Sequence, residues 1–370
     1  MARSHRRNSA NDFDDLLPGR VGAVTTVGSA VVVRISQVND LRHHGDVDAA
    51  PGLRDFAVNV RGLAPPSWLR DRLVAAIDRL GTYPSAQDDL RAREAVAQRH
   101  GRDPDEVLVL NGAAEGFALL PSLNPTKAAI LHPSFTEPEV VLRDADIPLH
   151  RVMPNEPVPD DADLVVVGNP NNPTSELRPA ATISALARPG RVLVVDEAFM
   201  DAVPGESESL AGADSPHILV LRSLTKTWAL PGLRAGYVLG HPDLLARLNR
   251  HRPHWPVGTL VLEAVAACAE PHAVKEAEEA AHQYARHREW LIAELKKTVH
   301  VHEPAAAPFL LVRVRDGERI RRQLRDRGIA VRRGDTFPGL TTDHLRIAVR
   351  EPAVAQHLLD ALTELTTEVP

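Results

Sequence analysis

Several residue patterns are scarce or missing in this 370-residue chain, and each absence excludes a class of protein. Cysteine occurs once, as Cys268, which excludes a disulfide scaffold and a cysteine-based metal site and favours a reducing, cytoplasmic compartment. No uncharged apolar run reaches transmembrane length, so we expect no membrane span. The net charge of −6 provides no overall basic field for nucleic acid. No histidine spacing matches a zinc-binding helix, and neither a Walker loop nor a serine nucleophile elbow occurs, so we expect no metal site.

The first forty residues carry little readable pattern. Arg6 and Arg7 are separated by several aspartates from the weakly apolar segment 21–33, which argues against a secretory or twin-arginine signal. Residues 31–35 are a candidate strand without an evident partner. We therefore interpret residues 1–40 as a partly disordered N-terminal extension of unknown role.

From residue 41 onward, short apolar runs alternate with helical patterns, which is typical of an α/β protein. Five runs are expected to form buried parallel strands, and a sixth strand follows the last of them: 107–110, 129–131, 164–167, 192–195, 218–221 and 235–239. We predict an N-terminal segment (41–80) that joins the small domain, a large domain (81–250), and a smaller α+β domain (251–370).

The stretch 223–237 carries the most informative chemistry. A lysine that forms a Schiff base needs an aldehyde beside it and a depressed pKa, and Lys226 is a candidate for such a bond with pyridoxal 5′-phosphate. Ser223, Thr225 and Arg234 flank it with phosphate donors. The alternative interpretation is an ordinary basic turn at a strand end.

Further candidates follow the carboxyl ends of other predicted strands, where ligands bind in open α/β sheets. The small residues at 111–115 let backbone N–H groups approach a phosphate. The rigid Asn-Pro-Asn-Asn-Pro loop holds Asn172, whose amide can donate to a ring oxygen, and Phe135 can stack on an aromatic ring. Asp196 ends an apolar strand and needs a partner, for which a protonated pyridine nitrogen is suitable. A plain turn, simple packing and a helix cap are the structural alternatives.

Two arginines are expected near the substrate. Arg346 lies on an alternating apolar strand and is suited to a bidentate clamp on a carboxylate, with Arg332 nearby in the sequence. A solvated edge arginine is the alternative.

The motifs, in this order, resemble the fold-type I enzymes that depend on pyridoxal phosphate (the aspartate aminotransferase superfamily). These motifs are Gly-Ala-Ala-Glu, Asn-Pro-Asn-Asn-Pro-Thr, Asp-Glu-Ala-Phe and Ser-Leu-Thr-Lys…Gly-Leu-Arg-Ala-Gly. The resemblance implies a large domain with a mostly parallel seven-stranded sheet and a smaller α+β domain. It also implies that Lys226 bonds the cofactor, Asp196 pairs with its ring nitrogen, Asn172 with its hydroxyl, and Phe135 with its face. The phosphate would be held by Ala113, Ala114, Ser223, Thr225 and Arg234.

The resemblance also implies a homodimer, with Tyr83 reaching the phosphate in the neighbouring subunit, and substrate binding by Asn172, Arg332 and Arg346. Some positions depart from the pattern of these enzymes. Phe199 stands where a tyrosine is usual, Ser175-Glu176 replaces a glycine, and Arg61 and Pro308 each replace an asparagine.

Two families within the superfamily are similar to the chain: histidinol-phosphate aminotransferase and the threonine-phosphate decarboxylase of cobalamin synthesis. The stretch from His44-Gly-Asp to Pro66 looks like the N-terminal signature of the decarboxylase, but Arg61 interrupts it. We therefore predict a histidinol-phosphate type aminotransferase that uses 2-oxoglutarate and glutamate, with the decarboxylase as the alternative. A transcription regulator of the same fold is disfavoured because residues 1–40 lack a helix-turn-helix pattern.

Overall fold

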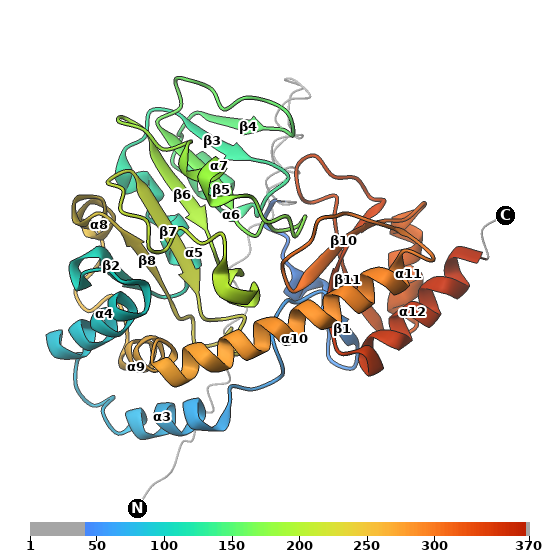
Figure 1. Cartoon of the computed structure of the whole chain (residues 1–370), viewed down its shortest axis with the longest axis horizontal. Coiled ribbons are helices and arrows are strands. Elements are labelled where there is room, and N and C mark those ends of the chain that lie inside the picture. Colours follow the sequence, from blue (N-terminus) through green and yellow to red (C-terminus); the bar gives the residue numbers. More distant parts are fainter. Residues whose placement is uncertain (1–40, 368–370) are drawn as a thin grey trace, which may run out of the picture. The chain divides into compact units, whose positions relative to one another are not determined.

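A computed structural model describes residues 41–367 of the chain. Residues 1–40, including the candidate strand at 31–35, lie outside the described part. Two sheets organise the rest (Figure 1).

The larger sheet has seven strands in the order β2-β8-β7-β6-β5-β3-β4. Its strands are β2 (Val107–Leu110), β3 (Ala128–Leu131), β4 (Leu149–Val152), β5 (Leu164–Gly168), β6 (Val192–Asp196), β7 (Ile218–Ser223) and β8 (Gly236–Gly240). The strands from β4 to β7 pair in parallel, whereas β8 is antiparallel to both of its neighbours. The predicted α/β class with a mostly parallel seven-stranded sheet is therefore confirmed.

The strand at 107–110 runs in the same direction as the parallel strands, but it pairs antiparallel with β8, which lies between it and β7. One strand of the sheet was not predicted. Strand β4 went unnoticed because its sequence, Leu-His-Arg-Val, is no apolar run; it lies at the edge of the sheet, where polar side chains remain partly exposed.

The smaller sheet has five strands in the order β1-β11-β12-β10-β9. They are β1 (Arg54–Phe56), β9 (His300–Val301), β10 (Phe309–Arg313), β11 (Ile329–Arg333) and β12 (His344–Ala348). Strand β1 pairs in parallel with β11, and the other pairs are antiparallel. A segment far upstream in the sequence thus completes a sheet built from the C-terminal part of the chain.

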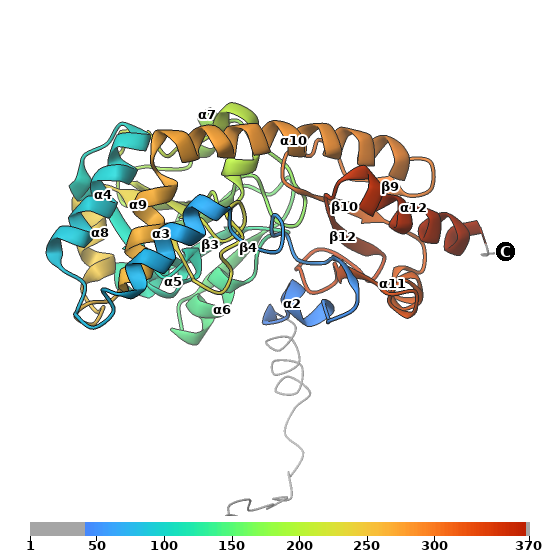
Figure 2. The same ribbon diagram turned by 90° about the horizontal axis from the view of Figure 1, so that it is seen from below.

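Helices cover both sheets, and Figures 1 and 2 show how they are distributed. They are α2 (Gly45–Asp48), α3 (Ser67–Ile77), α4 (Ala86–His100), α5 (Ala113–Ala118), α6 (Glu137–Asp144), α7 (Ala180–Ser184), α8 (Pro242–Asn249), α9 (Thr259–Cys268), α10 (Pro271–Leu295), α11 (Gly317–Asp326) and α12 (Pro352–Thr367). Helix α4 has sharp sequence-encoded limits, since Ser85 and Asp88 form a capping box and Gly101 ends it in the left-handed conformation.

The long helix α10 extends alongside both sheets (Figure 1), and it contributes to the hydrophobic core of each. Its first half contributes Ala273 and Ala277 to the core of the large sheet, and its second half contributes Leu291 and Leu295 to the core of the small sheet. Within residues 41–367, no helix combines the length and apolar character needed to cross a lipid bilayer.

Candidate active site

One cavity of about 410 Å³ gathers nearly all of the predicted site residues. It lies where the parallel strands of the large sheet end, and the small sheet supplies another part of its lining. The predicted residues that line it are Ala113, Ala114, Phe135, Asn172, Asp196, Ser223, Thr225, Lys226, Arg234, Arg332 and Arg346. Only Tyr83, among the predicted residues, lies outside this lining.

Lys226 follows the end of β7, in a loop that closes back on β8. The backbone N–H of Leu224 donates to the carbonyl oxygen of Ala235 over 3.1 Å, which fixes the loop at its base. Burial, with smaller contributions from the charges of Arg346 and Arg234, lowers the pKa of Lys226 to about 8. The free amine that attack on an aldehyde requires is therefore far more populated near neutral pH than in an ordinary lysine.

Asp196 is the last residue of β6 and lines the same cavity. Its Oδ1 accepts a hydrogen bond from the backbone N–H of Ala198 over 3.0 Å. Burial raises the pKa of Asp196 to about 6, against the effects of that bond and of the Lys226 charge. The hydrogen bond and the Lys226 charge do not offset the cost of burying this carboxylate in its ionised form. A cationic partner would offset it, and a protonated pyridine ring is such a partner.

Small residues and donors converge at one end of the cavity. Gly112 has φ +80°, and a Cβ there would lie 3.1 Å from Arg234 Nη2. A Cβ at Gly236 would lie 3.0 Å from the backbone nitrogen of Ala113, so the start of β8 packs directly on the start of α5. The hydroxyls of Ser223 and Thr225, 2.8 Å apart, face the same cavity. This collection of hydroxyl, guanidinium and backbone donors is suited to a phosphate.

Aromatic side chains form another part of the lining. The ring of Phe135 lies 5.4 Å from the His44 ring and 5.9 Å from the Phe117 ring, measured between centroids. Phe199 stands where related enzymes usually have a tyrosine. It packs edge-on against Phe309 with 4.9 Å between ring centroids and offers no hydroxyl to a ligand. Any bond to a ring oxygen must then come from elsewhere, and Asn172 lies in the same lining.

Arg346 of β12 connects the two sheets at the cavity. Its Nη1 donates to Asn172 Oδ1 over 2.6 Å and its Nη2 to the carbonyl oxygen of Ala57 over 2.7 Å. Its Nε is buried and has no hydrogen-bond partner among residues 41–367. Burial lowers the pKa of Arg346, yet a guanidinium keeps its proton in proteins. The alternative of a solvated edge arginine was therefore wrong.

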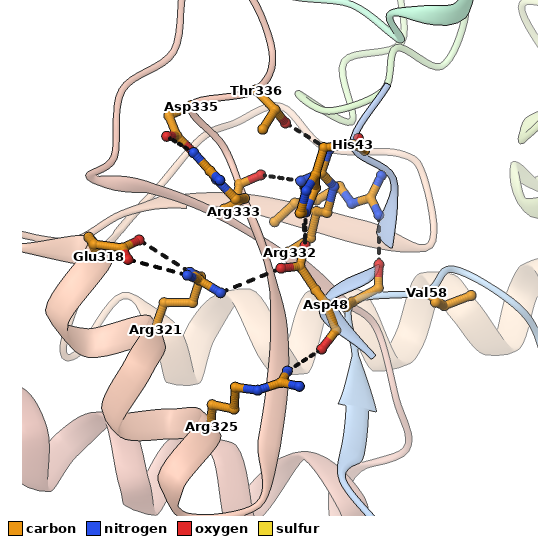
Figure 3. A network of polar contacts seen from close by, with 12 residues as sticks. His43, Asp48, Val58, Glu318, Arg321, Arg325, Arg332, Arg333, Asp335 and Thr336 are labelled. Carbon is orange, nitrogen blue, oxygen red and sulfur yellow. Dashed lines mark hydrogen bonds and ion pairs between the residues drawn. The ribbon is translucent and has the colours of Figure 1, made fainter. Parts of the chain in front are cut away.

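Arg332 of β11 is held by a polar network (Figure 3). It donates to Asp48 Oδ2 over 3.4 Å, to the His43 carbonyl oxygen over 2.5 Å and to Thr336 Oγ1 over 2.7 Å. Asp48 is buried and also contacts the side chains of His43 and Arg321. This network fixes α2 to the small sheet, and α2 in turn brings His44 and Asp46 to the cavity.

Sequence reasoning assigned no site role to several residues that the structure brings to the cavity. They include His44, Asp46, Asn59 and Phe337, together with the neighbours of Asn59. The stretch containing His44 and Asn59 was noticed only as a family signature, since its pattern carries no chemistry by itself. Ser175, where a glycine was expected, has φ +66°, and its Oγ accepts a hydrogen bond from the backbone N–H of Ala307 over 2.8 Å.

Tyr83 lies apart from the cavity lining. It is 72% exposed and stacks on Trp255, itself 56% exposed, with 4.2 Å between ring centroids. Within residues 41–367, no cluster of three or more histidine, cysteine or acidic side chains is arranged to hold a metal ion.

The residues of the cavity fit pyridoxal phosphate. A lysine with a lowered pKa, a half-buried carboxylate with a raised pKa, and a group of donors suited to a phosphate all line one cavity. This combination provides for the aldehyde, the ring nitrogen and the phosphate of the cofactor.

Comparisons with known proteins agree with this chemistry. The profile of the family "Aminotransferase class I and II" matches residues 55–362. A histidinol-phosphate aminotransferase of Mycobacterium tuberculosis is 55% identical over 316 residues, which cover 84% of this chain and 87% of that protein. A threonine-phosphate decarboxylase of Salmonella typhimurium is 31% identical over 343 residues, which cover 86% and 92%.

Solved structures show the same fold. The crystal structure of the histidinol-phosphate aminotransferase from Clostridium acetobutylicum has a TM-score of 0.77 and 24% sequence identity; the match covers 85% of this chain and 99% of that one. The chain belongs to the aminotransferase class I and II family and is a pyridoxal phosphate-dependent aminotransferase, as the order of its motifs predicted.

Proposed function

We propose that this protein transfers the amino group of a phosphorylated amine, histidinol phosphate, to the 2-oxo acid 2-oxoglutarate. The observation that carries the proposal is the arrangement of one cavity, with Lys226 and Asp196 on the large sheet and Arg332 and Arg346 on the small sheet. Bound pyridoxal phosphate supplies an electron sink that stabilises negative charge on the carbon bearing the substrate amine. The 55% identity to a histidinol-phosphate aminotransferase supports the choice of substrate and a role in histidine biosynthesis.

In this proposal, the residues of the large sheet bind and orient the cofactor. Lys226 forms the covalent bond, and Asp196 pairs with the ring nitrogen and keeps it protonated. Asn172 donates to the ring hydroxyl, and Phe135 lies against the ring face. The phosphate is held by Ala113, Ala114, Ser223, Thr225 and Arg234, all of which line the cavity.

Lys226 also moves a proton once the substrate amine has displaced it. Its amine, whose pKa is lowered to about 8 in the cofactor-free protein, would act as the general base that accepts the proton from the substrate Cα and would later donate that proton. A base whose pKa lies close to the working pH suits both halves of this transfer.

The positive groups on the small sheet bind the phosphate of the amine or the carboxylates of the oxo acid. Arg346 presents a planar guanidinium whose buried Nε has no partner within residues 41–367, and the nearby charge of Arg332 contributes to lowering the pKa of Arg346. Anions are the ligands that such a pair favours.

A homodimer completes the proposal, with Tyr83 reaching the phosphate site of the partner. Tyr83, Trp255 and the side chains of Val74, Ile77 and Leu80 are large apolar groups exposed on the described chain. Tyr83 and Trp255 stack on each other with 4.2 Å between ring centroids, and exposed aromatic side chains are enriched at association surfaces. A cytoplasmic location is part of the same proposal and is supported by the single, buried, unpaired Cys268.

The test is an assay of purified protein with histidinol phosphate and 2-oxoglutarate, and separately with threonine phosphate. Glutamate formation with the first pair supports the proposal. If only threonine phosphate reacts, with release of carbon dioxide and aminopropanol phosphate, the chain would be assigned to the decarboxylases of cobalamin biosynthesis. That second candidate is favoured by one observation, that His44 and Asn59 of the decarboxylase-like signature both line the cavity.

A further inference from the structure

An irregular segment, residues 57–61, forms one wall of the cavity, and we call it the cavity strap. Ala57, Val58, Asn59 and Val60 line the cavity, and none of these residues belongs to a helix or strand. A segment outside a helix or sheet has no regular ladder for its backbone groups, so other groups must bind them.

One arginine, Arg350, binds the carbonyl oxygens of two strap residues and of Asp55 in the preceding β1. Its Nη2 donates to Val58 O over 2.7 Å, its Nη1 to Val60 O over 3.2 Å, and its Nε to Asp55 O over 3.0 Å. Arg350 directly follows the small sheet, just beyond β12 and Val349. All three nitrogens of one planar guanidinium thus donate to carbonyl oxygens within residues 55–60.

The strap is also joined to the catalytic lysine. The backbone N–H of Arg61 donates to the carbonyl oxygen of Lys226 over 2.9 Å. At the other end, Asp55 Oδ1 accepts from the N–H groups of Ala57 and Val58 at 2.8 and 2.9 Å. The strap therefore runs from the small sheet to Lys226, with Arg350 bound along its length.

Asn59 is the strap residue with an unused polar group. It is 5% exposed, it lines the cavity, and its Oδ1 has no hydrogen-bond partner within residues 41–367. A buried acceptor without a donor is costly, and a bound ligand that supplies an N–H or O–H removes that cost.

We infer that Arg350 is a positioning residue, which holds the cavity strap against Lys226 so that Asn59 accepts a hydrogen bond from the bound amino substrate. This inference rests on the proposed function of the same cavity. Arg350 does not line the cavity, so it acts on substrate through the strap and through Asn59.

The experiment is a double-mutant cycle with Arg350→Gln, Asn59→Ala and the combined variant, assayed in the full-length protein loaded with pyridoxal phosphate. Each single change is expected to raise KM for histidinol phosphate about tenfold while kcat stays within about threefold, since both remove binding that is equal in the ground state and the transition state. The KM of the combined variant is expected to be no higher than the higher of the two single-variant KM values, because both changes remove the same interaction. Effects that multiply in the combined variant, or an unchanged KM, would overturn the inference.

Two further variants separate positioning from general stability. Arg327→Gln removes another arginine of the small-sheet region and should leave KM unchanged. Arg327 forms an ion pair with Glu364 over 3.5 Å, and neither residue lines the cavity. Arg350→Lys keeps the charge but cannot reach three carbonyl oxygens, so it should give an intermediate KM and carries the test if Arg350→Gln fails to fold.

A spectral titration distinguishes this inference from the proposed function. The absorbance of the lysine-bound cofactor is followed as histidinol phosphate, and then threonine phosphate, is added to each variant. If neither amine changes the wild-type spectrum, the proposed function fails. If one of them changes it equally well in wild type and in Arg350→Gln, only the inference about Arg350 fails.

Discussion

The Arg346 guanidinium donates to Asn172 Oδ1 over 2.6 Å, and this bond joins β12 of the small sheet to the loop after β5 of the large sheet. An amide has an acceptor end and a donor end. Because Arg346 occupies the acceptor, the Nδ2 donor of Asn172 remains for another partner. The residue proposed to bind substrate thus orients a residue proposed to bind the cofactor.

Replacing Arg346 by lysine tests this relationship. A lysine ammonium has no planar fork and cannot reproduce both bonds of Arg346, so KM for the phosphorylated amine should rise at least about tenfold. Retention of pyridoxal phosphate during dialysis should also fall, because Asn172 loses its orienting partner. Arg319→Lys, on the exposed side of α11, is the matched control; equal KM values in the two variants would contradict the prediction.

Replacing Lys226 by alanine should abolish covalent binding of the cofactor. The visible absorbance band of the lysine-bound cofactor should disappear, and kcat should fall by at least about a thousandfold, because both the nucleophile and the proton carrier are lost. Lys127→Ala removes an outlying lysine that pairs with the exposed Asp161 and should change neither property. A persistent band in Lys226→Ala would show that another amine binds the cofactor.

Asp196→Asn should have opposite effects on stability and on cofactor binding. Burial raises the pKa of Asp196 from 3.8 to about 6, so the folded protein binds this proton more tightly than the unfolded chain does. Ionisation therefore costs stability as pH rises from about 4 to above 6. The cofactor-free variant should be more stable than wild type by about 3 kcal/mol at pH 8, and by much less at pH 4.

Urea unfolding at the two pH values measures this difference. In the same variant, cofactor retention should decrease, since the ring nitrogen loses its anionic partner. A variant that is less stable than wild type at pH 8 without cofactor would mean that the carboxylate has a cationic partner within the protein.

Asp48→Ala should destabilise the small sheet and the attached α2. Asp48 is buried and contacts Arg332, Arg321 and His43, so its removal leaves the buried Arg332 without its acidic partner (Figure 3). The expected loss is about 3 kcal/mol in the free energy of unfolding. Asp48→Asn keeps an acceptor oxygen, so its free energy of unfolding should fall by less. If Asp48→Asn and Asp48→Ala lose the same amount, the effect comes from the charge alone.

Mixing two inactive variants tests the proposed homodimer. Tyr83→Ala and Lys226→Ala subunits, unfolded and refolded together, should form mixed dimers in which one site has both natural residues. Activity should recover to about a quarter of the wild-type value, because half of the dimers are mixed and each has one intact site of two. Trp255→Ser should shift the protein towards monomers in sedimentation experiments. Failure of the mixture to regain activity would mean that Tyr83 does not serve the partner's site.

Local patterns in the sequence were sufficient for most of the large sheet and for the cofactor side of the cavity. Apolar runs predicted six of its seven strands, because a strand buried on both faces must be apolar along its length. Lys226, Asp196 and Asn172 could be identified because each follows such a strand, and the carboxyl ends of parallel strands converge. Residue chemistry suggested candidate roles for them, and the resemblance in motif order favoured these roles over the structural alternatives.

Only the tertiary structure decided the substrate side. The sequence does not show that β1 joins a sheet formed some 270 residues later, that Arg350 gathers the carbonyl oxygens of the cavity strap, or that Arg332 is bound by Asp48. Contacts between distant segments depend on how the elements pack, and a side chain such as Asn59 acquires its chemistry from burial. The sequence by itself determined the architecture of the large sheet and singled out Lys226 as the candidate for the cofactor bond, whereas packing between the two sheets determined which other groups line the same cavity.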